Sequence, residues 1–331
     1  MNRGLDLVYA AEVLRQLDNV LIVTHEKPDG DAFGSALGLG RIMMENGRRA
    51  QVLLPEPLPE KYRALAGGDF RTALLPGELE AFDAVITLDA ACDSRVALGE
   101  GRQFPLPEIS VLNLDHHPDN SVSAEWSCVD GSMAATAELV ARLTGLIGWE
   151  ISPWAATMLL LGIVTDTGSF RFTNTTAETL RTAARLNECG ADWERVVNAA
   201  FFAKPRRQQE FEAAMLQSCV RSAWDGRFLY ALIPDELFAR YDFDMRDGET
   251  VIDLLREVAG VVVCALGYRR NGVFKLSLRS KDSRWPVGPV AQAFGGGGHR
   301  MAAGATVVAS DFAELEKMLL KQVGELFEST L

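Results

Sequence analysis

The chain has 331 residues, of which 48% are hydrophobic and 24% are charged, as is ordinary for a soluble globular protein. A chain of this length normally forms two domains, because single hydrophobic cores stop growing at roughly 250 to 300 residues. Acidic side chains number 45 against 33 basic ones, and the net charge is -12. This charge argues against a clamp on long duplex nucleic acid, whereas a small anionic substrate is compatible if bound metal ions reverse the local potential.

The sequence contains no pattern that predicts a membrane or secretory segment. Met1–Leu17 is amphipathic, is interrupted by acidic side chains and has no cleavage signal. The longest apolar stretch, Trp154–Val164, is shorter than the roughly 20 residues that cross a bilayer. The five cysteines are scattered without CxxC spacing, as is typical of reduced thiols. We therefore expect a soluble, cytoplasmic protein.

Short apolar runs in the first half of the chain predict strands that end near polar side chains. The runs and the residues that follow them are Val20–Val23 with His25, Ala84–Leu88 with Asp89, and Ser110–Leu114 with Asp115. Uninterrupted apolar runs suit a parallel sheet covered on both faces. Helical patterns lie between and after these runs, at Ala32–Glu45, Met133–Leu146 and Trp154–Val164. Since ligands of open α/β sheets bind beyond the carboxyl ends of strands, we expect the polar side chains to meet at one edge.

The second half of the chain predicts a helical connector and another α/β unit. Charged amphipathic patterns cover Ala177–Asn187 and Pro205–Arg221. Strand patterns and a closing helical pattern follow at Phe228–Ile233, Val261–Gly267, Val273–Leu278 and Phe312–Phe327. We predict a first domain over residues 1–190, a connector over 191–222 and a smaller second domain over 223–331.

All four histidines lie in short motifs that also carry aspartate or a run of glycines. The first motifs hold His25, Asp29 and Asp31 in THEKPDGDAFGS, Asp89 in VITLDAACDSRV, Asp115, His116 and His117 in NLDHHPD, and Asp166 in GIVTDTGSFRF. Imidazole and carboxylate together hold divalent metal ions of intermediate hardness. Taken singly, each motif also fits a plainer role, such as a surface turn in which Asp31 caps a helix. Their collection at one edge of a sheet predicts a metal centre.

These ordered motifs resemble those of the DHH phosphoesterase superfamily, and GGGGHRMAAG at Gly295–Gly304 resembles the signature of the DHHA1 accessory domain. The chain is similar in size to the stand-alone bacterial nanoRNase and pAp phosphatase branch. It lacks the extra length of RecJ-type exonucleases, and its GGGH segment differs from family II inorganic pyrophosphatases. The resemblance implies a parallel-sheet DHH catalytic domain with helices on both faces, and a smaller α/β DHHA1 domain across a cleft.

The resemblance also implies two manganese ions, although other divalent metals are compatible. The implied ligands are His25, Asp29 and Asp89 for one ion, and Asp31, Asp89, His116 and Asp166 for the other. Two such ions about 3.5 to 4 Å apart can activate water and stabilise charge during phosphate-ester hydrolysis. His117 would donate a hydrogen bond or proton to the leaving oxygen, and Asp115 would orient a histidine. Arg95 in ACDSRV either supports this site or forms a surface salt bridge.

The second domain carries candidate contacts to the substrate. These are Arg279 and Ser280 in KLSLRSKDSRW, and Gly296, Gly297, Gly298 and His299 in the glycine run. A guanidinium offers phosphate a bidentate fork, and glycine lets backbone approach a ligand closely. The plainer reading of the glycine run is a hinge or tight turn. Phe170 or Phe294 could stack on a base, although each also fits a place in the core.

We therefore predict a manganese-dependent phosphoesterase that hydrolyses very short oligoribonucleotides to mononucleotides, and adenosine 3',5'-bisphosphate to AMP. The first domain would cut, and the second would hold the far end of the substrate. The enzymatic alternative is a phosphodiesterase for cyclic di-AMP or pApA. The alternative from another class is an inactive nucleotide-binding module. Expected partners are these short oligoribonucleotides or small phosphorylated nucleotides, without a membrane, and a homodimer is compatible with the sequence.

Overall fold

The structure is a computed structural model that describes residues 3–54, 58, 60–63, 65–68, 70–74, 77–99, 102–245 and 251–328. The chain divides into two compact units, Met1–Ala203 and Lys204–Leu331, each with its own hydrophobic core. The division after Ala203 falls inside the range 191–222 in which the connector is expected. No helix in the described ranges is both long and apolar enough to cross a membrane.

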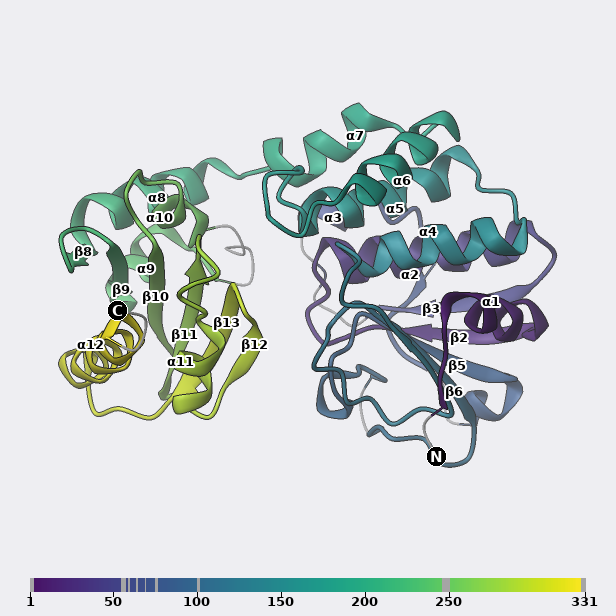
Figure 1. Cartoon of the computed structure of the whole chain (residues 1–331), viewed down its shortest axis with the longest axis horizontal. Coiled ribbons are helices and arrows are strands. Elements are labelled where there is room, and N and C mark those ends of the chain that lie inside the picture. Colours follow the sequence, from purple (N-terminus) through teal and green to yellow (C-terminus); the bar gives the residue numbers. More distant parts are fainter. Residues whose placement is uncertain are drawn as a thin grey trace. The chain divides into compact units, whose positions relative to one another are not determined.

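The first unit is built on a parallel sheet (Figure 1). Within the described residues its strand order is β1-β7-β6-β5-β2-β3-β4. The strands are β1 Arg3–Gly4, β2 Asn19–Val23, β3 Arg49–Leu53, β4 Phe70–Arg71, β5 Ala84–Leu88, β6 Ser110–Asp115 and β7 Trp126–Val129. All neighbouring pairs are parallel. The three strands predicted from apolar runs are confirmed as β2, β5 and β6, which lie side by side and are almost wholly buried.

One face of this sheet is covered by helices. The helices of the first unit are α1 Leu7–Gln16, α2 Gly30–Glu45, α3 Glu60–Arg63, α4 Thr136–Ile147, α5 Pro153–Asp166, α6 Ala177–Glu188 and α7 Trp193–Val197. Strand residues Val20 and Ile22 share a core with α1, α2, α4 and α5. Close approach of α2 and α5 requires glycine, because a Cβ on Gly34 would lie 2.3 Å from the carbonyl oxygen of Met158.

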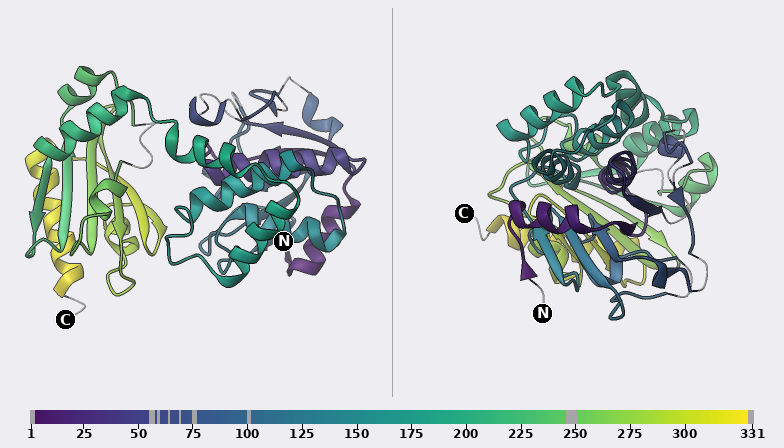
Figure 2. Two further views of the ribbon diagram at one scale, coloured as in Figure 1. Left: turned by 90° about the horizontal axis from the view of Figure 1, so that it is seen from above. Right: turned by 90° about the vertical axis from the view of Figure 1, so that its right-hand side faces the viewer.

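The other face differs from the expected second layer of helices. Leu21 and Val23 pack there against Leu79 of a short 3₁₀ helix, Glu78–Ala81, and against loop residues that include Val96 and Leu106. Figure 2 shows the long helices of this unit on one side of its sheet. The connection from β5 to β6 contains Pro105 and Pro107, and proline disrupts the interior of a helix. The parallel sheet is thus confirmed, while its second cover is made mainly of loops.

The second unit has a mostly antiparallel sheet with helices on both faces. In its described part the order is β12-β13-β11-β10-β9-β8, with only β9 and β10 parallel. The strands are β8 Val220–Ala223, β9 Phe228–Ile233, β10 Val263–Arg270, β11 Val273–Ser280, β12 Gly297–His299 and β13 Ala302–Val307. The helices are α8 Arg206–Ser218, α9 Asp235–Tyr241, α10 Asp253–Arg256, α11 Gly288–Ala293 and α12 Phe312–Glu328. Alternate residues of β9 face α12 on one side and α8 on the other.

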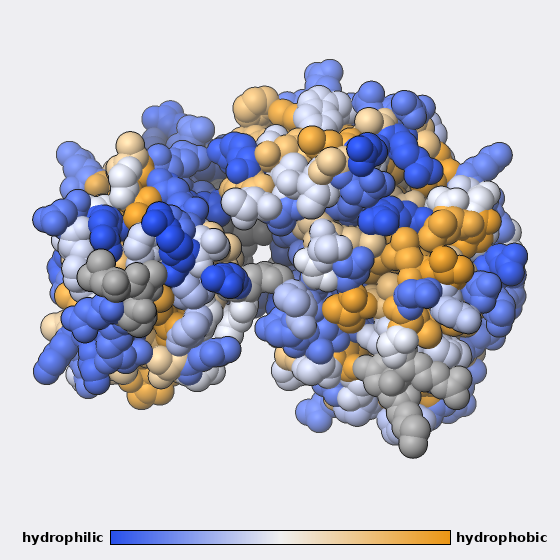
Figure 3. All heavy atoms as spheres, in the orientation of Figure 1, coloured by the Kyte–Doolittle hydropathy of each residue, from blue (hydrophilic) through white to orange (hydrophobic). Residues whose placement is uncertain are grey.

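Some apolar side chains remain on the surface of the first unit. Figure 3 shows hydrophobic surface over α1 and the end of α4, where Val8 is 57% and Leu146 is 55% exposed. Single exposed apolar residues are ordinary on globular proteins. The polar side chains that the sequence singles out lie elsewhere, at the carboxyl edge of the parallel sheet.

Candidate metal centre

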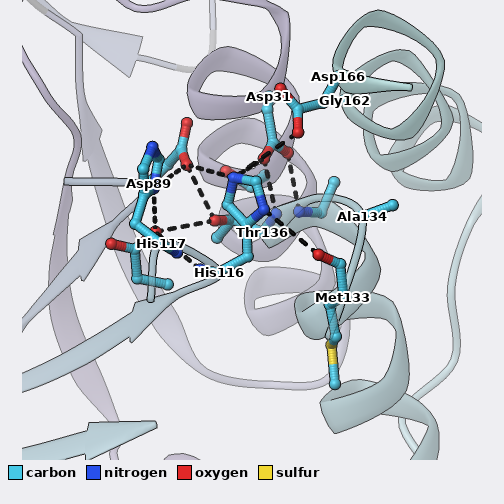
Figure 4. Close-up of polar contacts among 12 residues, drawn as sticks. Asp31, Asp89, His116, His117, Met133, Ala134, Thr136, Gly162 and Asp166 are labelled. Atoms are coloured by element: carbon cyan, nitrogen blue, oxygen red, sulfur yellow. Dashed lines mark hydrogen bonds and ion pairs between the residues drawn. The ribbon is translucent and has the colours of Figure 1, made fainter. Parts of the chain in front are cut away.

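The candidate metal centre forms beyond the carboxyl ends of β2, β5 and β6. Its side chains are His25 after β2, Asp29 and Asp31 at the start of α2, Asp89 after β5, Asp115, His116 and His117 at the end of β6, and Asp166 at the end of α5. Figure 4 shows that side chains from β5, β6, α2 and α5 converge on one point. The structure therefore brings together all eight residues that the motifs place at this edge.

One group of possible ligands consists of His25, Asp29 and Asp89, whose ligand atoms all lie within 4.8 Å of one another. The Nε2 atom of His25 is 3.9 Å from Oδ2 of Asp29 and 3.8 Å from Oδ2 of Asp89. The Nδ1 atom of His25 lies 2.7 Å from the carbonyl oxygen of Glu26. Because Nδ1 donates its proton to that carbonyl, the lone pair of Nε2 faces the carboxylates.

A second group consists of Asp31, His116 and Asp166. The Nε2 atom of His116 is 3.9 Å from Oδ2 of Asp31 and 3.7 Å from Oδ2 of Asp166. It is also 3.6 Å from Oδ1 of Asp89, whose other oxygen faces His25. Asp89 thus presents one carboxylate oxygen to each group, which is the arrangement of a residue that could bridge two ions.

The backbone of Asp89 is unusual for a side chain of this kind. Asp89 is 2% exposed and has a φ of +57°, a left-handed conformation that non-glycine residues seldom adopt and that often marks functional sites. The hydroxyl of Thr136 donates to its Oδ1 atom across 3.1 Å. Thr136 was not among the sequence-predicted residues, since only its place at the start of α4 reveals the contact.

Asp31 is held by the amino terminus of α4. The backbone N–H groups of Thr136 and Ala137 donate to its two carboxylate oxygens across 2.6 and 2.9 Å. The sequence predicted that this helix begins at Met133. It begins at Thr136, because the backbone of Ala135 is extended. Gly162 of α5 also lies against Asp31. Only glycine fits at this position, because a Cβ there would lie 2.8 Å from Oδ1 of Asp31.

The carboxylates of the centre repel one another. Burial raises the pKa of Asp31 well above its usual range, and the charges of Asp89 and Asp166 raise it further. Burial also raises the pKa of Asp166 to about 7; the charge of His116 opposes this rise, and those of Asp29 and Asp89 add to it. Within the described residues no lysine or arginine forms an ion pair with these carboxylates. Such a donor set fits divalent cations, which would neutralise it.

Asp115 and His117 form a hydrogen-bonded pair beside these groups. The Nδ1 atom of His117 is 2.8 Å from Oδ1 of Asp115, which also accepts the backbone N–H groups of His116 and His117. The amide of Asn120 donates to its Oδ2 across 2.5 Å. Although these side chains also lie within a possible ligand cluster, the short contacts show that hydrogen bonds already occupy Asp115.

This pair has a distinct electrostatic character. Burial would raise the pKa of Asp115, but its hydrogen bonds to His117 and Asn120 lower it overall. Burial likewise disfavours the charged form of His117, yet Asp115 and Asp89 outweigh it and raise the pKa of His117 to about 9, while Arg95 opposes the rise. The hydrogen bond between the two side chains therefore favours the ionised form of Asp115 and the protonated form of His117.

Asn120 is a second residue that the sequence motifs did not single out. Besides Asp115 it contacts the carbonyl of Ala90 at 3.0 Å, and its Oδ1 accepts from Asn113 at 3.0 Å. Asn113 is fully buried in β6 and is itself held by Thr87 of β5. This series of hydrogen bonds, from Thr87 through Asn113 to Asn120, fixes the position of the Asp115 carboxylate. In the sequence, Asn120 is recognisable only as the last residue of NLDHHPDN, the segment that contains the two adjacent histidines.

In the second unit, Arg279 and Ser280 end β11. Arg279 is half-buried, and its Nη1 donates to the carbonyl of Leu278 across 3.0 Å. The Ser280 hydroxyl is buried; it donates to the carbonyl of Asp282 at 2.9 Å and accepts from the N–H of that residue at 3.2 Å. Ser280 thus closes a turn, and its expected contact with substrate stays a prediction.

The glycine run forms the edge hairpin of β12 and β13. A Cβ on Gly296 would lie 2.2 Å from the carbonyl oxygen of Gly304, and Gly298 has a φ of +132°, so both positions require glycine. Gly297 faces open space. The backbone of His299 belongs to β12, and its imidazole lies outside the described residues.

The two aromatic candidates are both partly buried against hydrophobic cores. Phe170 packs against the core of the first unit and stacks on Trp193, with ring centroids 6.2 Å apart. Phe294 packs against the core of the second unit. These contacts give both rings a structural role, and base stacking stays a prediction.

Comparisons with known proteins agree with this arrangement. Residues 19–163 match the model of the DHH family, N-terminal domain, and residues 225–325 match that of the DHHA1 domain. The bifunctional oligoribonuclease and PAP phosphatase NrnA of Thermus thermophilus is 34% identical over 95% of this chain and 92% of its own length. The chain belongs to the DHH family. The family resemblance inferred from the motifs is thereby confirmed.

A further relative and a solved structure each align with almost the whole chain of this DHH protein. The bifunctional oligoribonuclease and PAP phosphatase NrnA of Bacillus subtilis is 25% identical, covering 90% of this chain and 92% of its own. The crystal structure of an exopolyphosphatase-related protein from Bacteroides fragilis has a TM-score of 0.83 at 22% identity, covering 97% of both chains. At that identity the structural likeness shows a shared fold.

Proposed function

We propose that this DHH protein is a metal-dependent phosphoesterase that hydrolyses very short oligoribonucleotides to mononucleotides and adenosine 3',5'-bisphosphate to AMP. The observation that carries the proposal is the position of Asp89, which offers one carboxylate oxygen to each of two groups of possible ligands. The substrates are supported by two relatives of nearly full coverage that are named oligoribonuclease and PAP phosphatase.

The proposed cofactor is a pair of manganese ions. The residues that would hold them are His25, Asp29 and Asp89 on one side, and Asp31, Asp89, His116 and Asp166 on the other. Oxygen ligands with a few imidazoles suit manganese-like ions. When bound, such ions lower the pKa of water and stabilise negative charge on phosphate oxygens. Inactivity is a weak alternative, because every proposed ligand is present and converges on one point.

The protein's own contribution to the chemical step is the Asp115–His117 pair. Asp115 holds the imidazole through Nδ1, so Nε2 is the atom that can give a hydrogen bond or proton to the leaving oxygen. Since the pKa of His117 is raised to about 9, the ring carries that proton at neutral pH. A positioned donor of this kind commonly accelerates hydrolysis by about 10²-fold to 10⁴-fold.

The second unit would bind the end of the substrate that is not cut. Arg279, Ser280, Gly296, Gly297, Gly298 and His299 form this proposed site. Its support is the half-buried Arg279, because a guanidinium can form paired hydrogen bonds with a terminal phosphate. A contact at the uncut end would favour substrates of a few nucleotides. The proposal places this activity in the cytoplasm, and a homodimer stays a prediction for light scattering to test.

The test is a direct comparison of substrates with the purified full chain. Di- to pentaribonucleotides, adenosine 3',5'-bisphosphate, pApA and cyclic di-AMP would be assayed with manganese and after its removal. We expect manganese-dependent release of mononucleotides from the ribonucleotides and of phosphate from the bisphosphate. Preferred hydrolysis of cyclic di-AMP or pApA would favour the alternative diesterase. Absence of turnover on every substrate would refute the proposed activity.

A further inference from the structure

Arg95 is fixed next to the segment that carries His25. It ends the 3₁₀ helix Asp93–Arg95, and its carbonyl accepts the N–H of Glu26 across 2.9 Å. The next residue, Val96, forms a β-bridge with His25 itself. The backbone of Arg95 is therefore joined to the segment that carries a proposed metal ligand and lies at the rim of the candidate metal centre.

The guanidinium of Arg95 meets no hydrogen-bond acceptor in the part of the chain that the structure describes. It is exposed, and among the described residues it forms no hydrogen bond or ion pair, so the surface salt bridge considered from the sequence is not formed. The nearest acid on the same helix, Asp93, is already used, because it accepts the N–H and the hydroxyl of Ser123, each across 2.6 Å. An arginine beside many carboxylates that pairs with none of them has its donors available for another anion.

Backbone pairing places Arg95 near the carboxylates of the centre. Its neighbour Val96 forms the β-bridge with His25, and Nε2 of His25 lies 3.9 Å from Oδ2 of Asp29 and 3.8 Å from Oδ2 of Asp89. Arg95 is thus a cationic residue at the rim of a cluster of carboxylates.

We propose that Arg95 binds a non-bridging oxygen of the phosphoryl group that is cut. This inference rests on the proposed function and names a residue that recognises its substrate class, phosphate mono- and diesters. A planar guanidinium suits phosphate because it offers two parallel N–H donors. Backbone hydrogen bonds join Arg95 to the segment that carries His25, and its positive charge offsets the repulsion that an acidic site exerts on an anion.

The test compares Arg95→Ala and Arg95→Lys with Arg15→Ala, a control that removes an equal charge from an exposed position on α1. Binding of inorganic phosphate to the manganese-loaded protein would be measured by calorimetry, and KM and kcat with a diribonucleotide. We expect Arg95→Ala to weaken phosphate binding and raise KM by about 10-fold or more, as for a lost charge-assisted hydrogen bond. Lysine should restore part of the loss, since it keeps the charge without the fork. The control should match the wild type.

Two outcomes would overturn this role. Phosphate affinity in Arg95→Ala equal to the wild type, or no phosphate binding by the wild type, would show that Arg95 is not a phosphate contact. Loss of manganese in Arg95→Ala would show that the residue acts on the centre or the fold. Phosphate binding needs no turnover, so weaker binding in Arg95→Ala would support this role even if the wild type hydrolysed none of the proposed substrates.

Discussion

The imidazole of His117 donates through Nδ1 to Oδ1 of Asp115 across 2.8 Å, and Asp115 is itself fully buried. The carboxylate accepts further hydrogen bonds from two backbone N–H groups and from Asn120. This bonding fixes both the position and the protonated nitrogen of the ring, as carboxylates do for histidines in other metal sites. This bonding fits the proposed role of His117 as a proton donor, whereas His116 turns Nε2 toward three carboxylates.

His117→Ala should keep bound manganese but slow turnover by about 10²-fold to 10⁴-fold, because a positioned acid is lost. Metal content by elemental analysis and kcat with a diribonucleotide would be measured together. The exposed neighbour Asp119 provides a control, and Asp119→Asn should behave as the wild type. Loss of metal from His117→Ala would mean that the roles of His116 and His117 have been exchanged.

Asp89→Asn should abolish activity and reduce metal content. Each carboxylate oxygen of Asp89 faces one ligand group, and the amide replaces one of these oxygens and removes the negative charge. The fold should persist, since the amide is nearly the same size as the carboxylate. Circular dichroism, elemental analysis and turnover would be recorded on one preparation. Two retained metal ions per chain with near wild-type turnover would refute the bridging assignment.

Thr136→Val should weaken manganese binding by about 10- to 100-fold, as for other lost supports of metal ligands. The substitution removes the hydroxyl that donates to Asp89 but keeps the backbone N–H that holds Asp31. A matched control is Thr144→Val on the same helix, where the hydroxyl only contacts carbonyls of its own turn. The manganese affinity of both variants would be measured by titration. Equal affinities of Thr136→Val and Thr144→Val for manganese would contradict a supporting role for Thr136.

The metal-free protein should become less stable as pH rises toward 8. Burial raises the pKa of Asp166 to about 7 and that of Asp31 well above its usual range, whereas an unfolded aspartate titrates near 4. Between these values the folded chain binds more protons, so its free energy of unfolding falls with rising pH. Bound cations would compensate the ionised carboxylates.

Calorimetry with and without manganese at pH 6 and pH 8 would measure this effect. We expect manganese to raise Tm more at pH 8, where the metal-free centre is ionised and no proton competes with the metal. In Asp166→Asn the difference between the two pH values should shrink. If manganese raised Tm equally at both pH values in the wild type, ionisation of these carboxylates would not be the cause of the pH dependence.

The parts of the centre that the sequence predicted are those that lie at the ends of recognisable elements. Runs such as Ala84–Leu88 read as buried strands because both faces are covered, and Asp89 follows directly. The second cover of the sheet was predicted wrongly as helical, although Pro105 and Pro107 in the β5–β6 connection disfavour a helix there.

Other features depend on contacts between distant residues. Thr136 meets Asp31 across 105 positions of the chain, and no local pattern encodes that distance. The late start of α4 has the same cause, because the N–H of Ala134 is bound by Glu138 and its carbonyl by Asn174. Helical periodicity extends through Met133, but these tertiary hydrogen bonds hold the segment extended.

Arg279→Ala should impair nucleotide substrates more than a small chromogenic phosphodiester, because the proposed contact binds the uncut end. Binding energy from a non-reacting part of a substrate contributes to kcat/KM only when that part is present. We expect kcat/KM for a triribonucleotide to fall about 10-fold or more, with a much smaller change for the chromogenic diester and unchanged manganese content. Lys275→Ala is the control, since Lys275 lies on the same strand and bonds Thr306 instead. Equal losses on both substrates, or depletion of metal, would place Arg279 in the catalytic centre or in the support of the fold. A selective loss would assign the second unit to substrate recognition and leave the chemistry to the first.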